Sequence, residues 1–316
     1  MMIVSFVIPH KHFYQVAKLQ SVGLMEHCLT INGYYFRHRL RTKHIYLPVS
    51  TLITSVRNER VKLVRALTDN QYRKTSKKIV CEGLRLVSDA LKRGLKPHFI
   101  LYSDDVFKST SFHQYFSKQL FSTSIAWKTT SEVISSISDT VTCQGIVAVF
   151  EQPSDGLSHH SDLVLICDKI QDPGNLGSLL RSAAAVGVDG VIVSPESTDP
   201  YSVKVLRGGM GAQFAIPIVT CEDWKRFLQV AKDLGDISFF LADSKAEQSH
   251  YDLCLVESLA VIVSSEAHGP SCYVRQLNPV EFKIPMQNSM ESLNVAVAGS
   301  VFLYEVLRQR KANQQK

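Results

Sequence analysis

The sequence predicts an α/β protein in which a small basic domain precedes a larger domain with a parallel sheet. From Ser55 onward, short apolar runs rich in β-branched residues alternate with segments of helical period, a pattern typical of α/β folds. Charge also divides the chain. Residues 1–150 carry 21 Lys and Arg against 9 Asp and Glu, whereas residues 151–316 carry 14 against 20. A balance of +12 in one part and −6 in the other indicates that the first part meets a polyanion.

Residues 1–54 differ in composition from the rest of the chain. They contain six Lys and Arg but only one acid, Glu26. Acid-poor leaders that contain Arg are typical of transit peptides, so we expect a cleaved leader and a mitochondrial location. The segment also holds several aromatic residues and few serines for such a peptide. The alternatives are a basic extension that stays on a cytoplasmic protein, or a misassigned start.

The segment 55–150 is predicted to form the small α/β domain. Helical spacing covers 55–67 and 84–92, with Gly94 as the C-cap of the second helix. Strands are predicted at 79–83, 98–102, 124–127 and 145–150, and a basic turn at 73–78. Residues 151–160 (EQPSDGLSHH) have no periodicity and are rich in Pro, Gly, Ser and His, so they are predicted to link two domains.

The segment 161–316 is predicted to form the parallel sheet. Strands are expected at 163–167, 190–193, 238–242, 259–263 and 281–284, and helices at 176–186, 224–234 and 293–308. Continuous apolar strands separated by helices indicate a sheet that is covered on both faces. No stretch reaches the ~18 apolar residues of a membrane span, so no membrane partner is expected. The seven cysteines are scattered without a Cys-x-x-Cys pair, which predicts free thiols and no metal site.

Two segments place polar residues at the carboxyl ends of predicted strands, where open α/β sheets bind ligands. Residues 168–187 read DKIQDPGNLGSLLRSAAAVG and carry Asn175 and Arg181 into a helix. Residues 261–271 read VIVSSEAHGPS, and Glu266 closely follows the strand. Each segment taken alone also fits an ordinary helix cap or an exposed loop. Neither matches a dinucleotide or phosphate-loop fingerprint.

A third segment precedes the last predicted helix. Residues 284–298 read IPMQNSMESLNVAVA, with Ser292 and Asn294 at the helix start. The free N–H groups of a helix N-terminus suit polar or anionic contacts, although a plain Ser or Asn cap is the simpler interpretation.

In this order, the three segments resemble the motifs of the SpoU/TrmH family of RNA ribose 2′-O-methyltransferases, including its mitochondrial rRNA members. The match covers about residues 160–310, and Arg57–Phe150 resembles the L30e-like RNA-binding domain that often precedes such an enzyme. The resemblance implies a SPOUT-type parallel sheet with a C-terminal trefoil knot, S-adenosyl-L-methionine as the cofactor, and a homodimer. Periodicity alone predicts no knot, which base rates disfavour.

The implied domains and site residues follow from the matched positions. The domains are a leader over 1–54, an L30e-like RNA-binding domain over 55–150, a linker over 151–160 and the catalytic domain over 161–316. The implied catalytic residues are Asn175, Arg181, Glu266, Ser292 and Asn294. The implied cofactor contacts are Ala242, Ser264, Gly269, Ile284, Met286 and Leu293.

The reaction that the resemblance implies is an in-line attack of a ribose 2′-oxygen on a methyl group, so the enzyme must mainly align this oxygen and help to remove its proton. Because a guanidinium is a poor base, we expect Arg181 to bind an RNA phosphate and stabilise the developing alkoxide. Asn175 is expected to orient Arg181 or the ribose, and Glu266 to steer Arg181 or the cofactor. Ser292 and Asn294 are expected to shape the cofactor loop.

Basic residues are dense in the first part of the small domain. Residues 57–93 contain eleven Lys and Arg against four acids, a density that suits phosphate contacts. The expected RNA contacts are Arg57, Arg60, Arg73, Lys74, Lys77, Lys78 and Arg85. A solvated helix face is the alternative for such a run.

Three positions depart from the family pattern. Ser264 and Asn288 stand where Gly is usual, and Ala296 stands where Ser is frequent. Ser264 adds a Cβ near the cofactor, whereas Asn288 tolerates a left-handed backbone better than most residues. The run Gly208–Ala212 is richer in Gly than usual, which predicts a looser loop.

Together these features predict S-adenosylmethionine-dependent methylation of a ribose 2′-hydroxyl, with ribosomal RNA as the expected substrate. One alternative is a tRNA 2′-O-methyltransferase. Another is an inactive RNA-binding ribosome assembly factor, which the Ser264 departure leaves open.

Overall fold

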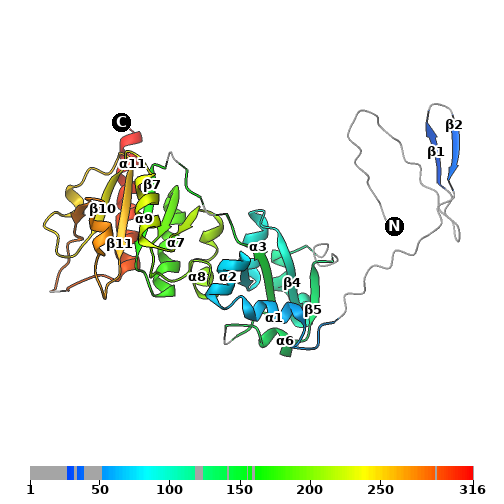
Figure 1. Cartoon of the computed structure of the whole chain (residues 1–316). Coiled ribbons are helices and arrows are strands. Elements are labelled where there is room, and N and C mark those ends of the chain that lie inside the picture. The colour runs from blue at the N-terminus through cyan, green and yellow to red at the C-terminus, as the bar shows by residue number, and fades with distance from the viewer. Residues whose placement is uncertain are drawn as a thin grey trace. The chain divides into compact units, whose positions relative to one another are not determined.

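The structure is a computed structural model that describes residues 27–31, 34–38, 52–117, 124–140, 142–154, 156–158, 161–288 and 290–315. Residues 50–316 form one compact unit with two sheets (Figure 1). In a separate unit, β1 (His27–Ile31) and β2 (Tyr34–His38) pair as antiparallel strands. The remainder of the predicted leader up to 51 lies outside the described residues.

The first sheet has four strands in mixed orientation. Their order is β3 (Lys78–Glu82), β6 (Ile146–Glu151), β4 (Pro97–Ser103) and β5 (Ala126–Thr129), and only the β4–β5 pair is parallel. Alternate strand residues enter two cores, one beneath α1 (Glu59–Ala66) and the other beneath α3 (Leu84–Lys92). All four strands and both helices were predicted within a few residues, because their apolar periods are long enough to read.

Short helices of this domain were not predicted. The basic turn expected at 73–78 is instead mostly α2 (Asn70–Ser76), which Asp69 caps and which ends at Lys77 in the left-handed region (φ 51°). The other three helices are α4 (Asp104–Lys108), α5 (Thr110–Tyr115) and α6 (Ser131–Ser135), each begun by a Ser or Thr side chain that accepts a backbone N–H. A helix of five to seven residues is too short to show an amphipathic period, so only the capping residues indicate these helices in the sequence.

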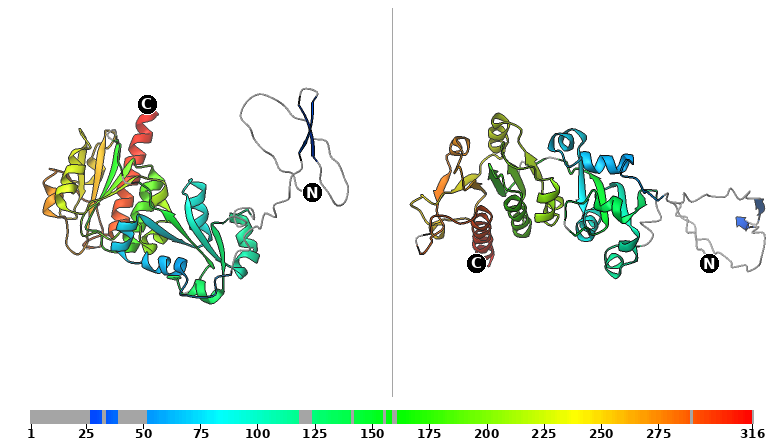
Figure 2. Two further views of the ribbon diagram at one scale, coloured as in Figure 1. Left: turned by 45° about the vertical axis from the view of Figure 1, so that its right-hand side comes forward. Right: turned by 90° about the horizontal axis from the view of Figure 1, so that it is seen from below.

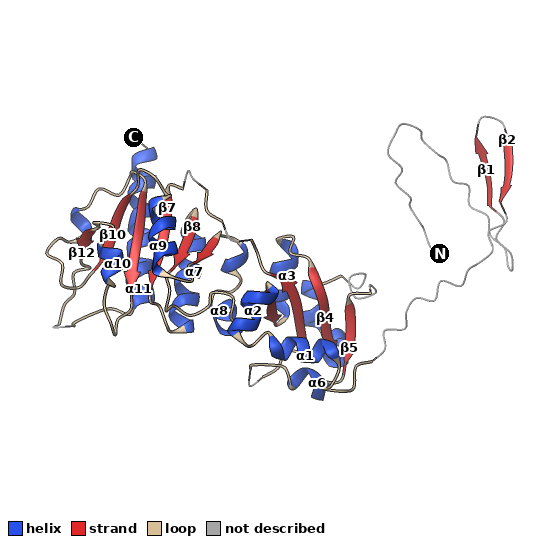
Figure 3. Ribbon diagram, viewed as in Figure 1, coloured by secondary structure: helices blue, strands red, loops and turns tan. Residues whose placement is uncertain are grey.

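The second sheet has six strands, all parallel (Figure 3). Their order is β12 (Val280–Phe282), β10 (Ser238–Ala242), β11 (Leu259–Ser264), β7 (Leu163–Asp168), β8 (Gly190–Val193) and β9 (Ile218–Thr220). The predicted parallel sheet is thereby confirmed, with β9 as an additional edge strand of three residues.

Helices cover both faces of this sheet, as predicted. One core lies beneath α7 (Pro173–Val186), α8 (Val203–Gly208) and the long helix α11 (Val295–Gln314). Helix α11, drawn in red in Figure 2, packs along β11. The other core lies beneath α9 (Trp224–Lys232) and the short α10 (Cys272–Arg275). None of the helices in the described part of the chain has the length and apolarity to cross a bilayer.

Helix α8 joins the two sheets. It lies against β3, and Leu206 of α8 together with Tyr201 just before it is buried in a core of the first sheet. Its C-terminal end packs on α7, where a Cβ on Gly177 would come within 2.9 Å of the backbone of Gly208 and Gly209. The Gly-rich run is therefore tightly packed, not loose as predicted, because its glycines permit two backbones to approach.

Candidate active site

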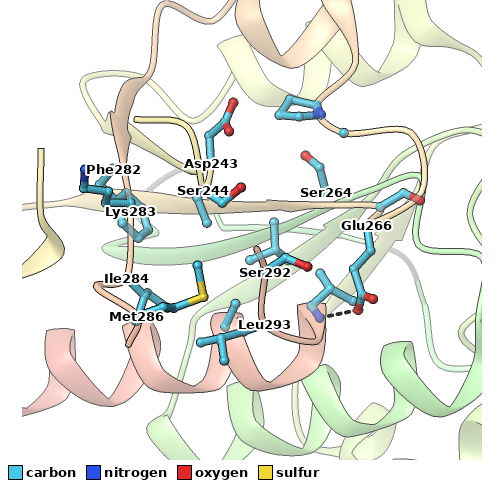
Figure 4. Close-up of a pocket in the computed structure, with 17 residues that line it drawn as sticks. Asp243, Ser244, Ser264, Glu266, Phe282, Lys283, Ile284, Met286, Ser292 and Leu293 are labelled. Atoms are coloured by element: carbon cyan, nitrogen blue, oxygen red, sulfur yellow. Dashed lines mark hydrogen bonds between the residues drawn. The ribbon is translucent and has the colours of Figure 1, made fainter. Parts of the chain in front are cut away.

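A cavity opens at the carboxyl edge of the second sheet, between the ends of β10, β11 and β12 and the N-terminus of α11 (Figure 4). It has about 710 Å³ of space, counting the part that opens to solvent. The six residues proposed to bind cofactor, Ala242, Ser264, Gly269, Ile284, Met286 and Leu293, all line it. Two of the residues proposed for the reaction, Glu266 and Ser292, line it as well.

Glu266 holds the start of α11. Its Oε1 accepts a hydrogen bond of 2.6 Å from the backbone N–H of Val295, the first residue of that helix (Figure 4). The N–H groups of a first helical turn have no partner within the helix, so a carboxylate there stabilises the turn. The contact of Glu266 in the structure is thus with α11, and its expected role of steering Arg181 or the cofactor stays a prediction.

Asn294 is the N-cap of the same helix and also reaches α7. Its Oδ1 accepts hydrogen bonds from the N–H groups of Ala296 and Val297, at 3.0 and 3.3 Å. Its Nδ2 donates to Oδ1 of Asn175 at 2.9 Å. Two amides that lie 119 residues apart in the sequence therefore connect the starts of α7 and α11 beside the cavity.

Arg181 is not brought into this group. It is exposed on α7, it does not line the cavity, and it makes no hydrogen bond or ion pair with any residue that the structure describes. At about 100° per residue, six positions place Arg181 roughly 120° around the helix from Asn175. Spacing along the sequence put both residues at one edge, but the helical rotation separates them.

Ser264 does not project freely into the cavity. Its Oγ donates to Oδ2 of Asp168 at 3.0 Å, and the same oxygen accepts the backbone N–H of Ser271 at 2.8 Å. Asp168 is fully buried, and this burial raises the pKa of its carboxyl group. The sequence reasoning missed Asp168, and it missed Asp243, which lines the cavity. Both residues end or directly follow parallel strands, the signal that could have found them.

The other two departures from the family pattern have local explanations. Asn288 has φ 59°, so it occupies the left-handed region that a Gly favours, as its residue type predicted. Ala296 is 6% exposed and belongs to the core between the sheet and α11, where a methyl group is fully accommodated.

Most of the expected RNA contacts lie on the surface, but Arg73 does not. Its side chain is 4% exposed and forms an ion pair with Asp199. Arg60 lies over the ring of Trp127 at 3.8 Å from the centroid, and Lys78 is 3.6 Å from a carboxylate oxygen of Glu151. The proposed RNA contacts that remain at least partly exposed are Arg57, Arg60, Lys74, Lys77, Lys78 and Arg85. Arg73 is removed from the set because a buried, paired side chain cannot reach a phosphate.

Comparisons with known proteins cover both sheets. Residues 162–304 match the SpoU rRNA methylase family, and residues 58–148 match the MRM3-like substrate-binding domain. The chain is 32% identical over 294 residues to the mitochondrial rRNA methyltransferase 3 of Mus musculus. This match covers 75% of this chain and 69% of the relative. It is 28% identical over 254 residues to a 23S rRNA guanosine 2′-O-methyltransferase of Bacillus subtilis, which spans 80% of this chain and 98% of the relative.

A solved structure has the same fold. The AdoMet-bound rRNA methyltransferase of Sinorhizobium meliloti is similar with a TM-score of 0.70 and 27% identity, over 81% of this chain and 97% of that protein. The sequence motifs, the six-stranded parallel sheet with its preceding mixed sheet, and these matches agree. The chain belongs to the SpoU rRNA methylase family.

Proposed function

We propose that this chain transfers a methyl group from S-adenosyl-L-methionine to a ribose 2′-hydroxyl of ribosomal RNA. The observation that carries the proposal is the cavity at the carboxyl edge of the parallel sheet, lined by the residues at the family's cofactor positions. The relative from Bacillus subtilis, a 23S rRNA 2′-O-methyltransferase, supports both the RNA class and the reacting group.

The lining of the cavity fits this cofactor in its chemistry. Ile284, Met286 and Leu293 offer apolar contacts for a purine ring, while polar groups of Ser264 and Asp243 lie on another part of the wall. Pockets for small ligands and cofactors commonly combine apolar walls with a few polar groups. S-adenosylmethionine supplies an electrophilic methyl group on a sulfonium.

The chain's own residues then align the RNA. Arg181, exposed on α7 and without a partner in the described part of the chain, is available to bind an RNA phosphate. Asn175, held by Asn294, orients the ribose, and Glu266 fixes the start of α11 at the cavity. Ser292 lines the cavity beside Leu293 and shapes the loop around the methionine part of the cofactor.

Three finer features complete the proposal: a trefoil knot in the C-terminal part, a homodimer and a mitochondrial location. An apolar stripe of Val297, Val301 and Tyr304 supports the homodimer, because the three side chains are 39–52% exposed on one side of α11. The acid-poor composition of residues 1–54 supports the location. Light scattering measures the molar mass and tests the homodimer. The wild type is expected to be a dimer and Val301→Glu a monomer, whereas a monomeric wild type would contradict the homodimer.

The test of the activity has two steps. Calorimetric titration of the full chain with S-adenosylmethionine is expected to show binding, and 2′-O-methyl mapping after depletion is expected to show a site that disappears from ribosomal RNA. Loss of a site from tRNA instead would favour the tRNA enzyme. Absence of binding would favour the inactive assembly factor, the alternative that the Ser264 departure leaves open.

A further inference from the structure

We infer that Asp168 is a positioning residue that holds the cofactor loop, residues 264–271, in the shape that binds S-adenosylmethionine. The inference rests on the proposed function and extends it to a buried carboxylate that makes no contact with the cavity. Its basis is that one side chain at the end of β7 connects the first and last residues of the loop.

The contacts of Asp168 tie both ends of the loop to one point. Asp168 and Ser264 are partners in the register of the adjacent strands β7 and β11, and Oδ2 of Asp168 accepts Oγ–H of Ser264. Seven residues later the same Oδ2 accepts the backbone N–H of Ser271. The backbone carbonyl of Asp168 also accepts the N–H of Ser265 at 3.1 Å. The loop is thus fixed where it leaves β11 and where it enters α10.

The loop that these contacts fix forms a wall of the cavity. Ser264, Ser265, Glu266, Gly269 and Pro270 all line it. Glu266 also connects this loop to α11, because its carboxylate accepts a hydrogen bond from the backbone N–H of Val295. A shift of the loop would therefore move the wall and the helix start together, and pockets bind well only when such groups are held in place.

Stability alone does not explain a carboxyl group at this place. Asp168 is fully buried, and its Oδ1 has no hydrogen-bond partner among the described residues. Burying a carboxylate that is only partly hydrogen-bonded lowers the stability of the fold. A buried aspartate that costs stability is expected where function requires it. The two bonds to the loop are the function that the geometry offers.

Asn is the informative substitution at this position. Because one oxygen accepts both hydrogen bonds, an amide oxygen can replace it while the NH2 group takes the place of Oδ1. Asp168→Asn therefore keeps the positioning contacts and removes the charge. Asp168→Ala removes both contacts, and Ser264→Ala removes one of them.

The chain also offers a matched control, Asp189. One of its carboxylate oxygens likewise accepts two hydrogen bonds, from the backbone N–H groups of Asp162 at 2.7 Å and Leu163 at 2.9 Å. These contacts lie at the opposite end of β7, away from the cavity. Asp189→Ala thus removes the same kind of contact from the same strand without touching the cofactor loop.

The experiment measures the S-adenosylmethionine Kd by calorimetry, the melting temperature, binding of purified ribosomal RNA, and turnover for each full-length variant. Asp168→Ala is expected to raise the cofactor Kd about tenfold, the size typical of supporting contacts, and to leave RNA binding unchanged. Ser264→Ala is expected to raise the cofactor Kd by a smaller factor. Asp168→Asn and Asp189→Ala are expected to bind the cofactor as the wild type does.

Each result decides the inference. An unchanged cofactor Kd in both Asp168→Ala and Ser264→Ala would overturn it, and so would a Kd raised as much by Asp189→Ala. An Asp168→Asn protein that binds cofactor normally but no longer turns over would overturn it too, because the charge would then act in the chemistry. If Asp168→Ala does not fold, Ser264→Ala and Asp168→Asn carry the test. Wild-type protein that binds no cofactor would instead reject the proposed function itself.

Discussion

Arg73 in α2 and Asp199 in the loop before α8 form a buried ion pair that joins the two sheets. Nε and Nη2 of Arg73 both lie 2.7 Å from Oδ2 of Asp199, and the two side chains are 4% and 12% exposed. Nη1 of Arg73 donates to the carbonyl oxygens of Leu67 and Thr68, each at 2.7 Å. The residue that resembled an RNA contact is thus a structural link between the parts of the chain that carry the two sheets.

Removing one partner of this pair is expected to destabilise the protein strongly. Arg73→Ala leaves the Asp199 carboxylate without its cation in a buried place, which costs about 3–5 kcal/mol in comparable pairs. Urea unfolding measures the loss. The control is Arg85→Ala, since Arg85 pairs with Asp89 at 3.8 Å on the surface and is expected to cost under about 0.5 kcal/mol. Equal effects of the two substitutions would contradict the structural role of Arg73.

The basic run shows what the sequence can and cannot predict here. Long apolar periods located the strands and the major helices, and ordered motifs located the cavity. Arg73 and Lys74 are adjacent cations with no difference in pattern, and only the packing of α2 turns one inward. The pair of Asn175 and Asn294 likewise depends on the approach of two helix starts across 119 residues, which no local period encodes.

Neutralising Lys74, Lys77 and Lys78 together to Gln is expected to weaken RNA binding without unfolding the protein. The slope of log K against log salt is negative, and each lost phosphate contact makes it less steep by roughly 0.7–0.9. Filter binding of purified ribosomal RNA at several salt concentrations gives this slope. A matched surface change on α9, Lys225→Gln with Arg226→Gln, is expected to leave it unaltered. An unchanged slope in the triple variant would place the RNA elsewhere.

Asn294→Asp separates the two roles of this residue. A carboxylate caps the helix as well as an amide does, so the melting temperature is expected to change little. The Nδ2 donor to Asn175 is lost, and turnover on RNA is expected to fall about tenfold because Asn175 is no longer oriented. Asn294→Ala, which loses both roles, is expected to lower stability by about 1 kcal/mol as well. Full turnover in the Asp variant would remove Asn175 from the proposed alignment of the ribose.

Glu305 on α11 is expected to give the fold a measurable pH dependence. Hydrogen bonds from Arg308, and then from Gln309, lower the pKa of this carboxyl group to about 2. Because folding lowers its pKa from the ordinary value of 4.5, Glu305 stabilises the fold above that value, and the contribution disappears as the pH falls towards 2. The difference in melting temperature between wild type and Glu305→Gln is therefore expected to shrink over this window. A difference that stays constant would show that the carboxylate is not paired.

Gly177→Ala is expected to disturb both stability and turnover. Gly to Ala within a helix normally stabilises it by roughly 1 kcal/mol. Here the new Cβ would lie 2.9 Å from backbone atoms of Gly208 and Gly209, which cannot move aside as a side chain does. Helix α7, which carries Asn175, must then shift away from α8, which packs against the first sheet.

Gly299→Ala on α11 is the comparison that isolates this backbone contact. Its Cβ would meet Cδ2 of Leu179 at 2.5 Å and Cγ1 of Val263 at 3.2 Å, which are side-chain and not backbone atoms. We therefore expect Gly177→Ala to lower the melting temperature more than Gly299→Ala does, and to reduce turnover on RNA while cofactor binding is retained. The reverse order would mean that the separation of α7 from α8 is not what limits this part of the fold. In that case the tight packing of the Gly-rich run against α7 would contribute less to stability than the packing of α11 against α7.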